Sequence, residues 1–315
     1  MLRNILFSGA TEKTSENAAV SAERMERIKK TVRDNSLLGA ELIKRAEECG
    51  CAFVFVPGMK AAGSYLAQKN CIALNPSLSD ERLASTVVHE SRHCEQMQNA
   101  PEFGGYCSYR SADLIKVCRT READAQAFQC ASAYEMRREA PAVWSAYAEA
   151  SPKVAAAYEQ SRKEGKDLES SLPEAFKAWF DNGNYVDYYD RKVLSSLERA
   201  VDSGAAGVMS EKAPSDRLLT SLCQSGGKSY MRGEDLKFLE TPRGSTVTED
   251  IFFRCDSVTE KAFDKGLCEK EDLSFVGLYV KDGNRVVKAS QKTPKRPEPE
   301  ISPATLAMLS KGRGR

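Results

Sequence analysis

The segment STVVHESRHCEQ, residues 85–96, contains both histidines of the 315-residue chain. His89 and His93 are four residues apart, and Glu90 directly follows the first of them. On a helix, residues four apart lie one turn apart on the same face, so the two imidazoles can point toward a common spot. That spacing suits two ligands of a tetrahedral zinc ion with bonds of about 2.0–2.1 Å. The segment therefore predicts a helix with a metal-binding face.

Glu90 follows His89 and lies about 100° further round such a helix, beside the metal rather than on it. There it can accept a proton from a zinc-activated water, whose pKa zinc lowers to about 7. This is the HExxH arrangement of zinc hydrolases. Two histidines placed at random would give this spacing and the adjacent Glu on the order of once in a thousand trials. The alternative is an exposed amphipathic helix with two surface histidines.

A catalytic zinc site needs a third protein ligand, and no histidine remains to supply it. The choice falls on carboxylates and thiolates. Residues 121–128 read READAQAF, in which Glu122 is acidic and small alanines alternate along the segment. Those alanines permit close packing, so a second helix laid across the first can bring Glu122 to the metal.

HESRH followed by EADAQAF resembles the gluzincin branch of the zincin metallopeptidases, especially its minimal bacterial members. In these, HExxH precedes a helix of pattern E-x-[ED]-A-[ND]-x-F. The resemblance implies one zinc ion held by His89, His93 and Glu122, with Glu90 as general base for peptide-bond hydrolysis. Gln126 stands where the family has Asn or Asp, a position that implies a hydrogen bond orienting a zinc-bound histidine. The resemblance covers residues 50–135 and supplies no substrate, because similar bacterial domains are described only as metallopeptidases.

Other ligands compete with Glu122. Cys118 lies four residues before it, and Cys94 adjoins His93. A cysteine ligand would resemble peptide deformylase, although the Gly-rich and EGCLS motifs of that enzyme are missing. Asp124 is two residues from Glu122 and points to a different side of the helix, so we expect a solvated or capping charge there.

A peptidase also needs a donor for the oxyanion of its tetrahedral intermediate. The candidate donors are tyrosines, for each of which a packing role is the alternative that we expect. They are Tyr106, Tyr185, Tyr188 and Tyr189.

Apolar periodicity, caps and turn residues predict a succession of helices around a short β-region. The predicted elements are two helices within 14–49 broken near Asp34–Ser36, a buried strand at 51–56, a hairpin of 63–67 with 71–74, a helix from Ser79 or Asp80 to about Gln98, and helices at 111–139, 141–149, 152–164 and 173–200. Aromatic side chains of the later helices are expected in the core. They are Trp144, Tyr147, Trp179, Phe180, Tyr185, Tyr188 and Tyr189.

Composition changes after about Val201, where Gly, Ser and Asp become frequent and the helical pattern weakens. The clearest later element is a hairpin of 275–280 with 285–289 around an Asp-Gly turn. We predict an α+β fold, mostly helical, with a zincin-like small β-sheet before an active-site helix pair. The expected units are N-terminal helices (1–50), a metallopeptidase domain with a helical extension (51–200), a small C-terminal region (201–290) and a disordered basic, Pro-rich tail (291–315).

Lys and Arg number 46 against 45 Asp and Glu, so the chain has no overall preference for a polyanion, and we expect no nucleic-acid partner. Ten scattered cysteines without a CxxC pair indicate reduced core thiols. No apolar run approaches the roughly 20 residues that span a bilayer. The N-terminal MLRNILFSGA has too short an apolar stretch for a signal peptide. We expect a cytoplasmic protein without a membrane partner, and export by another route stays open.

Two hypotheses follow. The first is a zinc peptidase whose peptide or protein substrate lies antiparallel to the Cys71–Leu74 strand. The second is a catalytically silent protein of the same fold that acts as a binding or regulatory module. An open or a filled cleft beside Glu90 distinguishes them.

Overall fold

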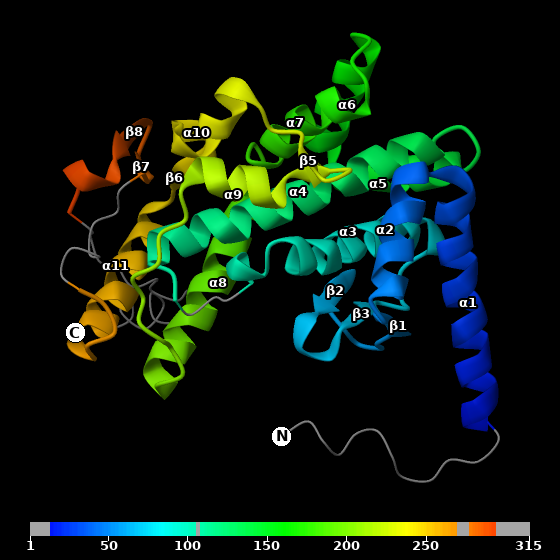
Figure 1. Cartoon of the computed structure of the whole chain (residues 1–315), viewed down its shortest axis with the longest axis horizontal. Coiled ribbons are helices and arrows are strands. Elements are labelled where there is room, and N and C mark those ends of the chain that lie inside the picture. Colours follow the sequence, from blue (N-terminus) through cyan, green and yellow to red (C-terminus); the bar gives the residue numbers. More distant parts are fainter. Residues whose placement is uncertain (1–12, 105–107, 270–276, 294–315) are drawn as a thin grey trace, which may run out of the picture.

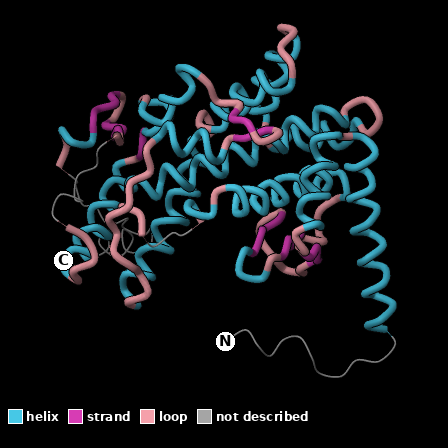
Figure 2. The backbone as a smooth tube through the Cα atoms, viewed as in Figure 1, coloured by secondary structure: helices cyan, strands magenta, loops and turns pink. Residues whose placement is uncertain are grey.

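The computed structural model describes residues 13–104, 108–269 and 277–293. Figure 1 shows an assembly of helices with short strands at its margins. Figure 2 shows that the sheet formed by residues 52–74 lies on one side of this helical body. The predicted α+β, mostly helical fold is confirmed. Within the described residues, no helix has both the length and the apolar character needed to cross a membrane.

Two helices open the described chain, α1 (Lys13–Asn35) and α2 (Leu37–Glu48). They are separated at Ser36, whose side chain accepts a hydrogen bond from the Gly39 amide and so caps α2. Gly50 follows α2 with a φ of 71°, a left-handed conformation that glycine adopts without steric cost. The predicted break between the helices is confirmed.

The first sheet contains β1 (Ala52–Phe55), β2 (Gly63–Leu66) and β3 (Cys71–Leu74) in the order β1-β3-β2. The predicted hairpin is confirmed: β2 and β3 are antiparallel and are joined through the 3-10 helix η1 (Ala67–Lys69). β1 was predicted to be buried, and this is wrong. Among the described residues it pairs with β3 alone and is an edge strand, and Val54 on it is 39% exposed.

β3 is the central strand, with all four of its residues buried. Both of its edges are paired, with β1 and with β2. Cys71–Leu74 therefore has no free edge for a substrate, and this part of the prediction is wrong. The free edge on the other side of the hairpin belongs to β2.

The central helices are α3 (Asp80–Asn99) and α4 (Ser111–Met136), which lie against each other (Figure 1). Ser79 caps α3 by accepting a hydrogen bond from the Arg82 amide, as predicted. β2 and β3 pack on α3. Nearly every residue of α4 is buried, because α2, α3 and helices that follow in the chain surround it. The short 3-10 helix η2 (Pro101–Phe103) follows α3.

Four helices follow α4. They are α5 (Pro141–Ala150), α6 (Pro152–Lys163), α7 (Leu168–Trp179) and α8 (Gly183–Ser203). The single helix predicted at 173–200 is wrong. Asp167 starts α7 upstream of Pro173 by accepting a hydrogen bond from the Ser170 amide, and the backbone leaves the helical region at Asn182 (φ −93°, ψ 77°).

The C-terminal part holds more helix than its composition predicts. Its elements are α9 (Ser215–Leu222), β4 (Gln224–Ser225), β5 (Lys228–Ser229), η3 (Gly233–Glu240), α10 (Pro242–Ser245), β6 (Thr246–Val247), α11 (Glu249–Asp264), β7 (Tyr279–Asp282), β8 (Arg285–Lys288) and η5 (Ala289–Gln291). The β7–β8 hairpin confirms the predicted one, with Gly283 in its turn at φ 58°. The first two residues of the predicted hairpin (275–276) and residues 294–315 of the predicted tail lie outside the described residues.

The buried apolar side chains form one cluster that runs from Met25 to Ala289. Of the described cysteines, Cys49 is exposed, Cys118 is half-buried and the others are buried; all are free thiols. The prediction of core thiols is confirmed for the buried cysteines, and their redox state stays a prediction. The division into four units stays a prediction.

Candidate metal centre

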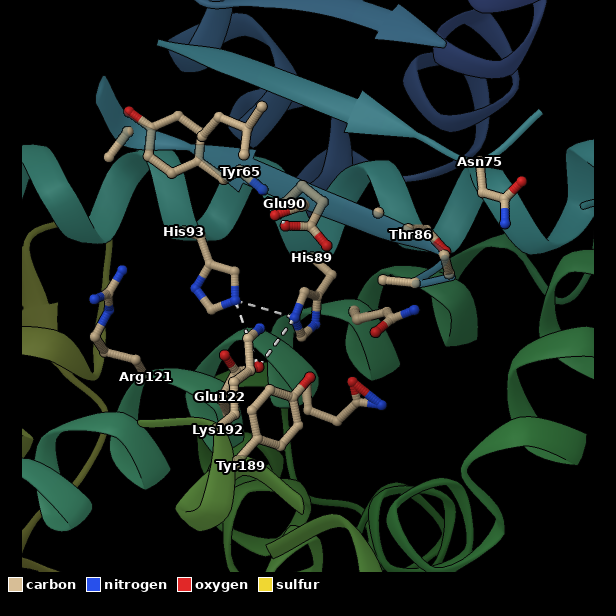
Figure 3. Close-up of a pocket in the computed structure, with 18 of the residues that line it drawn as sticks. Tyr65, Asn75, Thr86, His89, Glu90, His93, Arg121, Glu122, Tyr189 and Lys192 are labelled. Carbon is tan, nitrogen blue, oxygen red and sulfur yellow. Dashed lines mark hydrogen bonds and ion pairs between the residues drawn. The ribbon is translucent and has the colours of Figure 1, made fainter. Parts of the chain in front are cut away.

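The structure brings three of the predicted site residues together. His89 and His93 project from α3, and Glu122 projects from α4 to meet them (Figure 3). The two Nε2 atoms lie 3.1 Å apart. Glu122 Oε2 lies 3.5 Å from His89 Nε2 and 3.6 Å from His93 Nε2. Among the described residues, these three side chains form the group whose possible metal-ligand atoms all lie within 4.8 Å of one another.

The orientation of His93 is fixed by Gln96, one turn further along α3. Gln96 Nε2 donates to Asp124 Oδ2 (2.6 Å) and to the Arg121 carbonyl (3.0 Å). The amide oxygen Oε1 therefore faces His93 Nδ1, at 2.9 Å. When the ring is neutral, Nδ1 carries the proton and the Nε2 lone pair is directed at the cluster.

Asp124 is fully buried behind this amide, and the prediction of a solvated or capping charge is wrong. It accepts hydrogen bonds from Arg92 Nε (2.7 Å), Arg92 Nη2 (3.0 Å) and the Tyr230 hydroxyl (2.7 Å). Burial acts to lower the pKa of Arg92, but the charges of Asp124 and Glu95 outweigh it and raise that pKa. The Arg92–Asp124 ion pair therefore fixes the carboxylate that binds Gln96, and Gln96 in turn fixes His93.

Gln126 does not orient a histidine, contrary to the expectation from its position in the motif. Its Nε2 donates to Ser151 Oγ at 2.8 Å, because this side of α4 faces the α5–α6 connection. Gln96 orients His93 instead. The i, i+3 spacing of His93 and Gln96 on one helix was the signal in the sequence.

The charges of the three converging groups support one another. Burial acts to raise the pKa of Glu122, but the charge of His93 and hydrogen bonds from both histidines hold it well below its usual value. Burial acts to lower the pKa of His89, but the Glu122 hydrogen bond and the Glu90 and Glu122 charges raise it. Glu122 is therefore an ionised carboxylate.

Glu90 is buried between α3 and the edge strand β2 (Figure 3). Its Oε2 accepts a hydrogen bond from the Tyr65 amide at 2.7 Å. The absence of a side chain at Gly63 permits this approach, since a Cβ there would lie 2.8 Å from Glu90 Cγ and 2.7 Å from Thr86 Cγ2. The sheet and the helix are thus joined at the residue predicted to act as a base.

The Tyr65–Glu90 hydrogen bond also shows which backbone groups of β2 point away from β3. In an antiparallel pair, alternate residues direct their N–H and C=O groups toward the partner strand. Since Tyr65 directs its amide away from β3, Gly63 and Tyr65 face the unpaired edge. That edge lines the cavity described next.

A cavity of about 1140 Å³ opens beside the cluster. Residues of β2 and of α8 contribute to its walls, and His89, Glu90, His93 and Glu122 line it as well. Small-molecule pockets generally have volumes of about 300–1,000 Å³. The space suits an extended ligand. The Arg92 side chain, on the same helix as the histidines, does not fill it, because it forms an ion pair with Asp124.

Three of the four candidate tyrosines lie at this cavity. Tyr185 and Tyr188 are 40% and 58% exposed, so their predicted place in the core is wrong. Tyr189 lies beside Glu122 (Figure 3). Burial raises its pKa, and the charges of Glu122 and Glu90 add to the effect, so the hydroxyl keeps its proton. Tyr106 lies outside the described residues.

Comparison with known proteins is consistent with this arrangement. Residues 7–231 match the model of a family described as "Putative metallopeptidase family (DUF6782)". The chain belongs to this metallopeptidase family. No curated protein matches the chain, and neither does any solved structure.

Membership of a metallopeptidase family implies a metal ion, and the converging side chains fit one. A tetrahedral ion with bonds of about 2.1 Å holds its ligand atoms about 3.4 Å apart. The three separations here are 3.1, 3.5 and 3.6 Å. Two imidazole nitrogens and one carboxylate oxygen leave a fourth position for water or substrate.

The alternative cysteine ligands do not join this group among the described residues. Burial and the neighbouring Glu122 charge raise the pKa of Cys118, which disfavours the thiolate that a metal needs. Cys94 is buried on the side of α3 that faces Asn70, whose Oδ1 lies 4.0 Å from its sulfur.

Proposed function

We propose that this metallopeptidase is a zinc-dependent peptidase of the gluzincin type, with His89, His93 and Glu122 as metal ligands. The convergence of these three side chains from two helices is the observation that carries the proposal. Because two of them come from HExxH and the third from a carboxylate on the next long helix, the donor set matches the one that the sequence resemblance implies.

A bound zinc ion would lower the pKa of water and polarise the substrate carbonyl. Glu90 then serves as general base and later as general acid. Its Oε2 is held by the Tyr65 amide, while Oε1 accepts no hydrogen bond from a described residue. Oε1 takes the proton from the attacking water and delivers it to the leaving amine.

Tyr189 is our candidate for stabilising the oxyanion. Its hydroxyl stays protonated next to Glu122 and faces the cavity from α8. A neutral hydroxyl there donates a hydrogen bond to the oxygen on which charge develops in the transition state.

The edge of β2 is our candidate for binding the substrate backbone. The Gly63 N–H and the Gly63 and Tyr65 C=O groups point outward at the cavity beside the proposed metal ligands, while the Tyr65 N–H donates to Glu90. A peptide laid along this edge adds a strand to the sheet and gains main-chain hydrogen bonds with little side-chain selectivity.

The experiment is a cleavage screen of a mixed peptide library, read by mass spectrometry, on wild type and Glu90→Gln. We expect cleavage by the wild type only, with the same metal content in both proteins, because Glu90 is not a ligand. Retained cleavage in Glu90→Gln would remove the proposed base. The open cavity favours this peptidase over a catalytically silent binding module.

A further inference from the structure

The charge of the cavity differs from that of the whole chain. Over the full sequence, 46 Lys and Arg balance 45 Asp and Glu. Among the described residues, the cavity walls hold five cations, which are Lys60, Lys69, Arg82, Arg121 and Lys192, against two acids, Glu90 and Glu122. A cleft lined by one sign of charge focuses the field and attracts ligands of the opposite sign.

The two acids do not offset these cations toward a ligand. The Glu122 carboxylate already pairs with the two histidines. Glu90 is buried and accepts a hydrogen bond from the Tyr65 amide. Lys60, Lys69 and Lys192, in contrast, are exposed and form no ion pair with any described residue.

The cations are distributed along the length of the cavity. Lys60 precedes β2 and Lys69 follows it, in η1. Lys192 lies on α8, across the cavity from β2, and Figure 3 shows it beside Glu122 and Tyr189. Its Nζ is 5.6 Å from the centre of the Tyr189 ring. Lys192 is therefore a cation beside the proposed chemistry that forms no ion pair with a described residue.

We propose that the cavity selects acidic peptide segments, with Lys192 pairing with an Asp or Glu side chain next to the scissile bond. The part that concerns the scissile bond rests on the proposed peptidase function. A peptide is favoured over a nucleic acid because the β2 edge offers main-chain groups that match an extended peptide. The cations at Lys60 and Lys69 then receive acidic residues further along the segment.

Binding is measured by fluorescence anisotropy on Glu90→Gln after chelator treatment, so that a carboxylate cannot bind through a metal. The probes are two fluorescein-labelled peptides of alternating Ala and charged residues, identical except that Asp in one is Lys in the other. We expect the Asp peptide to bind about tenfold more tightly at low salt. Adding Lys192→Glu should remove or reverse this preference. The matched control is Lys228→Glu, an exposed lysine outside the cavity, which should leave it unchanged.

Equal affinity for both peptides would overturn the inference, as would an equal loss in Lys228→Glu. A single-stranded oligonucleotide that competes as strongly as the Asp peptide would overturn it in favour of a general polyanion site. If the wild type cleaves peptides without charge preference, the inference fails and the proposed function stands. If the acidic preference holds but nothing is cleaved, the proposed function fails and the binding site stands.

Discussion

Gln96 shows how a single side chain can orient one of the proposed metal ligands. It accepts from His93 Nδ1 and is itself held by Asp124 and the Arg121 carbonyl. Such outer partners of a ligating histidine fix its tautomer and ring orientation. We expect Gln96→Leu to weaken metal binding by about 10–100-fold. A competition titration with a chromophoric chelator measures this.

The matched control is Gln98→Leu, because Gln98 is exposed on the same helix and faces away from the histidines. It should retain wild-type affinity. An equal loss in both variants would mean that a general change of α3, and not the orientation of His93, lowers the affinity.

At the residue scale, spacing along one helix predicts contacts within that helix. His89, Glu90 and His93 follow from it directly. The solvated charge expected at Asp124 and the histidine contact expected at Gln126 were both wrong. α4 is buried on almost every side, so helical periodicity does not reveal which neighbour each side chain meets. The Arg92–Asp124 ion pair depends on a contact between two helices, which spacing along either one cannot show.

At the scale of elements, the contact of β2 with α3 sets the position of Glu90. A Cβ at Gly63 would meet Glu90 Cγ at 2.8 Å and force that side chain to move. A misplacement of about 1 Å in an active site can lower the rate by roughly 10²-fold. We expect Gly63→Ala to lower kcat/KM to about that extent and to retain a folded protein, as measured by peptide cleavage and circular dichroism.

Gly207→Ala is the control, since a Cβ there meets no heavy atom within 4 Å. Its activity should match that of the wild type. Unchanged kcat/KM in Gly63→Ala would show that Glu90 adjusts without loss, and the tight contact of β2 with α3 would then have no part in catalysis.

The pairing of α1 with α2 makes stability depend on pH. Partial burial acts to raise the pKa of Glu47, but hydrogen bonds from Lys29 and Arg33 outweigh it and lower that pKa below 4.5. The stabilisation is therefore present above pH 4.5 and is lost as pH falls through the folded-state pKa. We expect Glu47→Gln to cost about 0.5–1 kcal/mol at pH 7, after allowance for solvent screening, and little in acid.

Urea denaturation of wild type and Glu47→Gln across this pH range measures the difference. Glu48→Gln removes a partner of the exposed Lys44 and should cost less at every pH. A Glu47→Gln deficit that stays constant down to strongly acidic pH would contradict the assigned pKa shift.

Elements with strong local signals were predicted well, and those set by tertiary contacts were not. Ser36, Ser79 and the Asp282-Gly283 turn fix their elements locally. The whole of α11 was missed, although its buried residues Ile251, Cys255, Val258 and Ala262 recur at helical spacing. The surrounding Gly- and Ser-rich composition obscured that period.

At the scale of the whole molecule, the cavity lies between parts of the chain that are far apart in sequence. β2 and α3 form one side, and α8 brings Tyr189 and Lys192 to the other. The sequence predicted the metal ligands from two segments, yet it could not predict the opposite wall. That wall depends on how α8 packs against α4, which is a property of the assembled core.

The central claim is that one zinc ion binds to His89, His93 and Glu122. Its most direct test is the zinc content of the purified chain by plasma mass spectrometry, with Glu122→Ala and the cysteine variant Cys118→Ala measured beside it. We expect close to one zinc per chain in the wild type and in Cys118→Ala, and a large loss in Glu122→Ala. A wild type that binds no zinc, or a Glu122→Ala variant that retains it fully, would contradict the account.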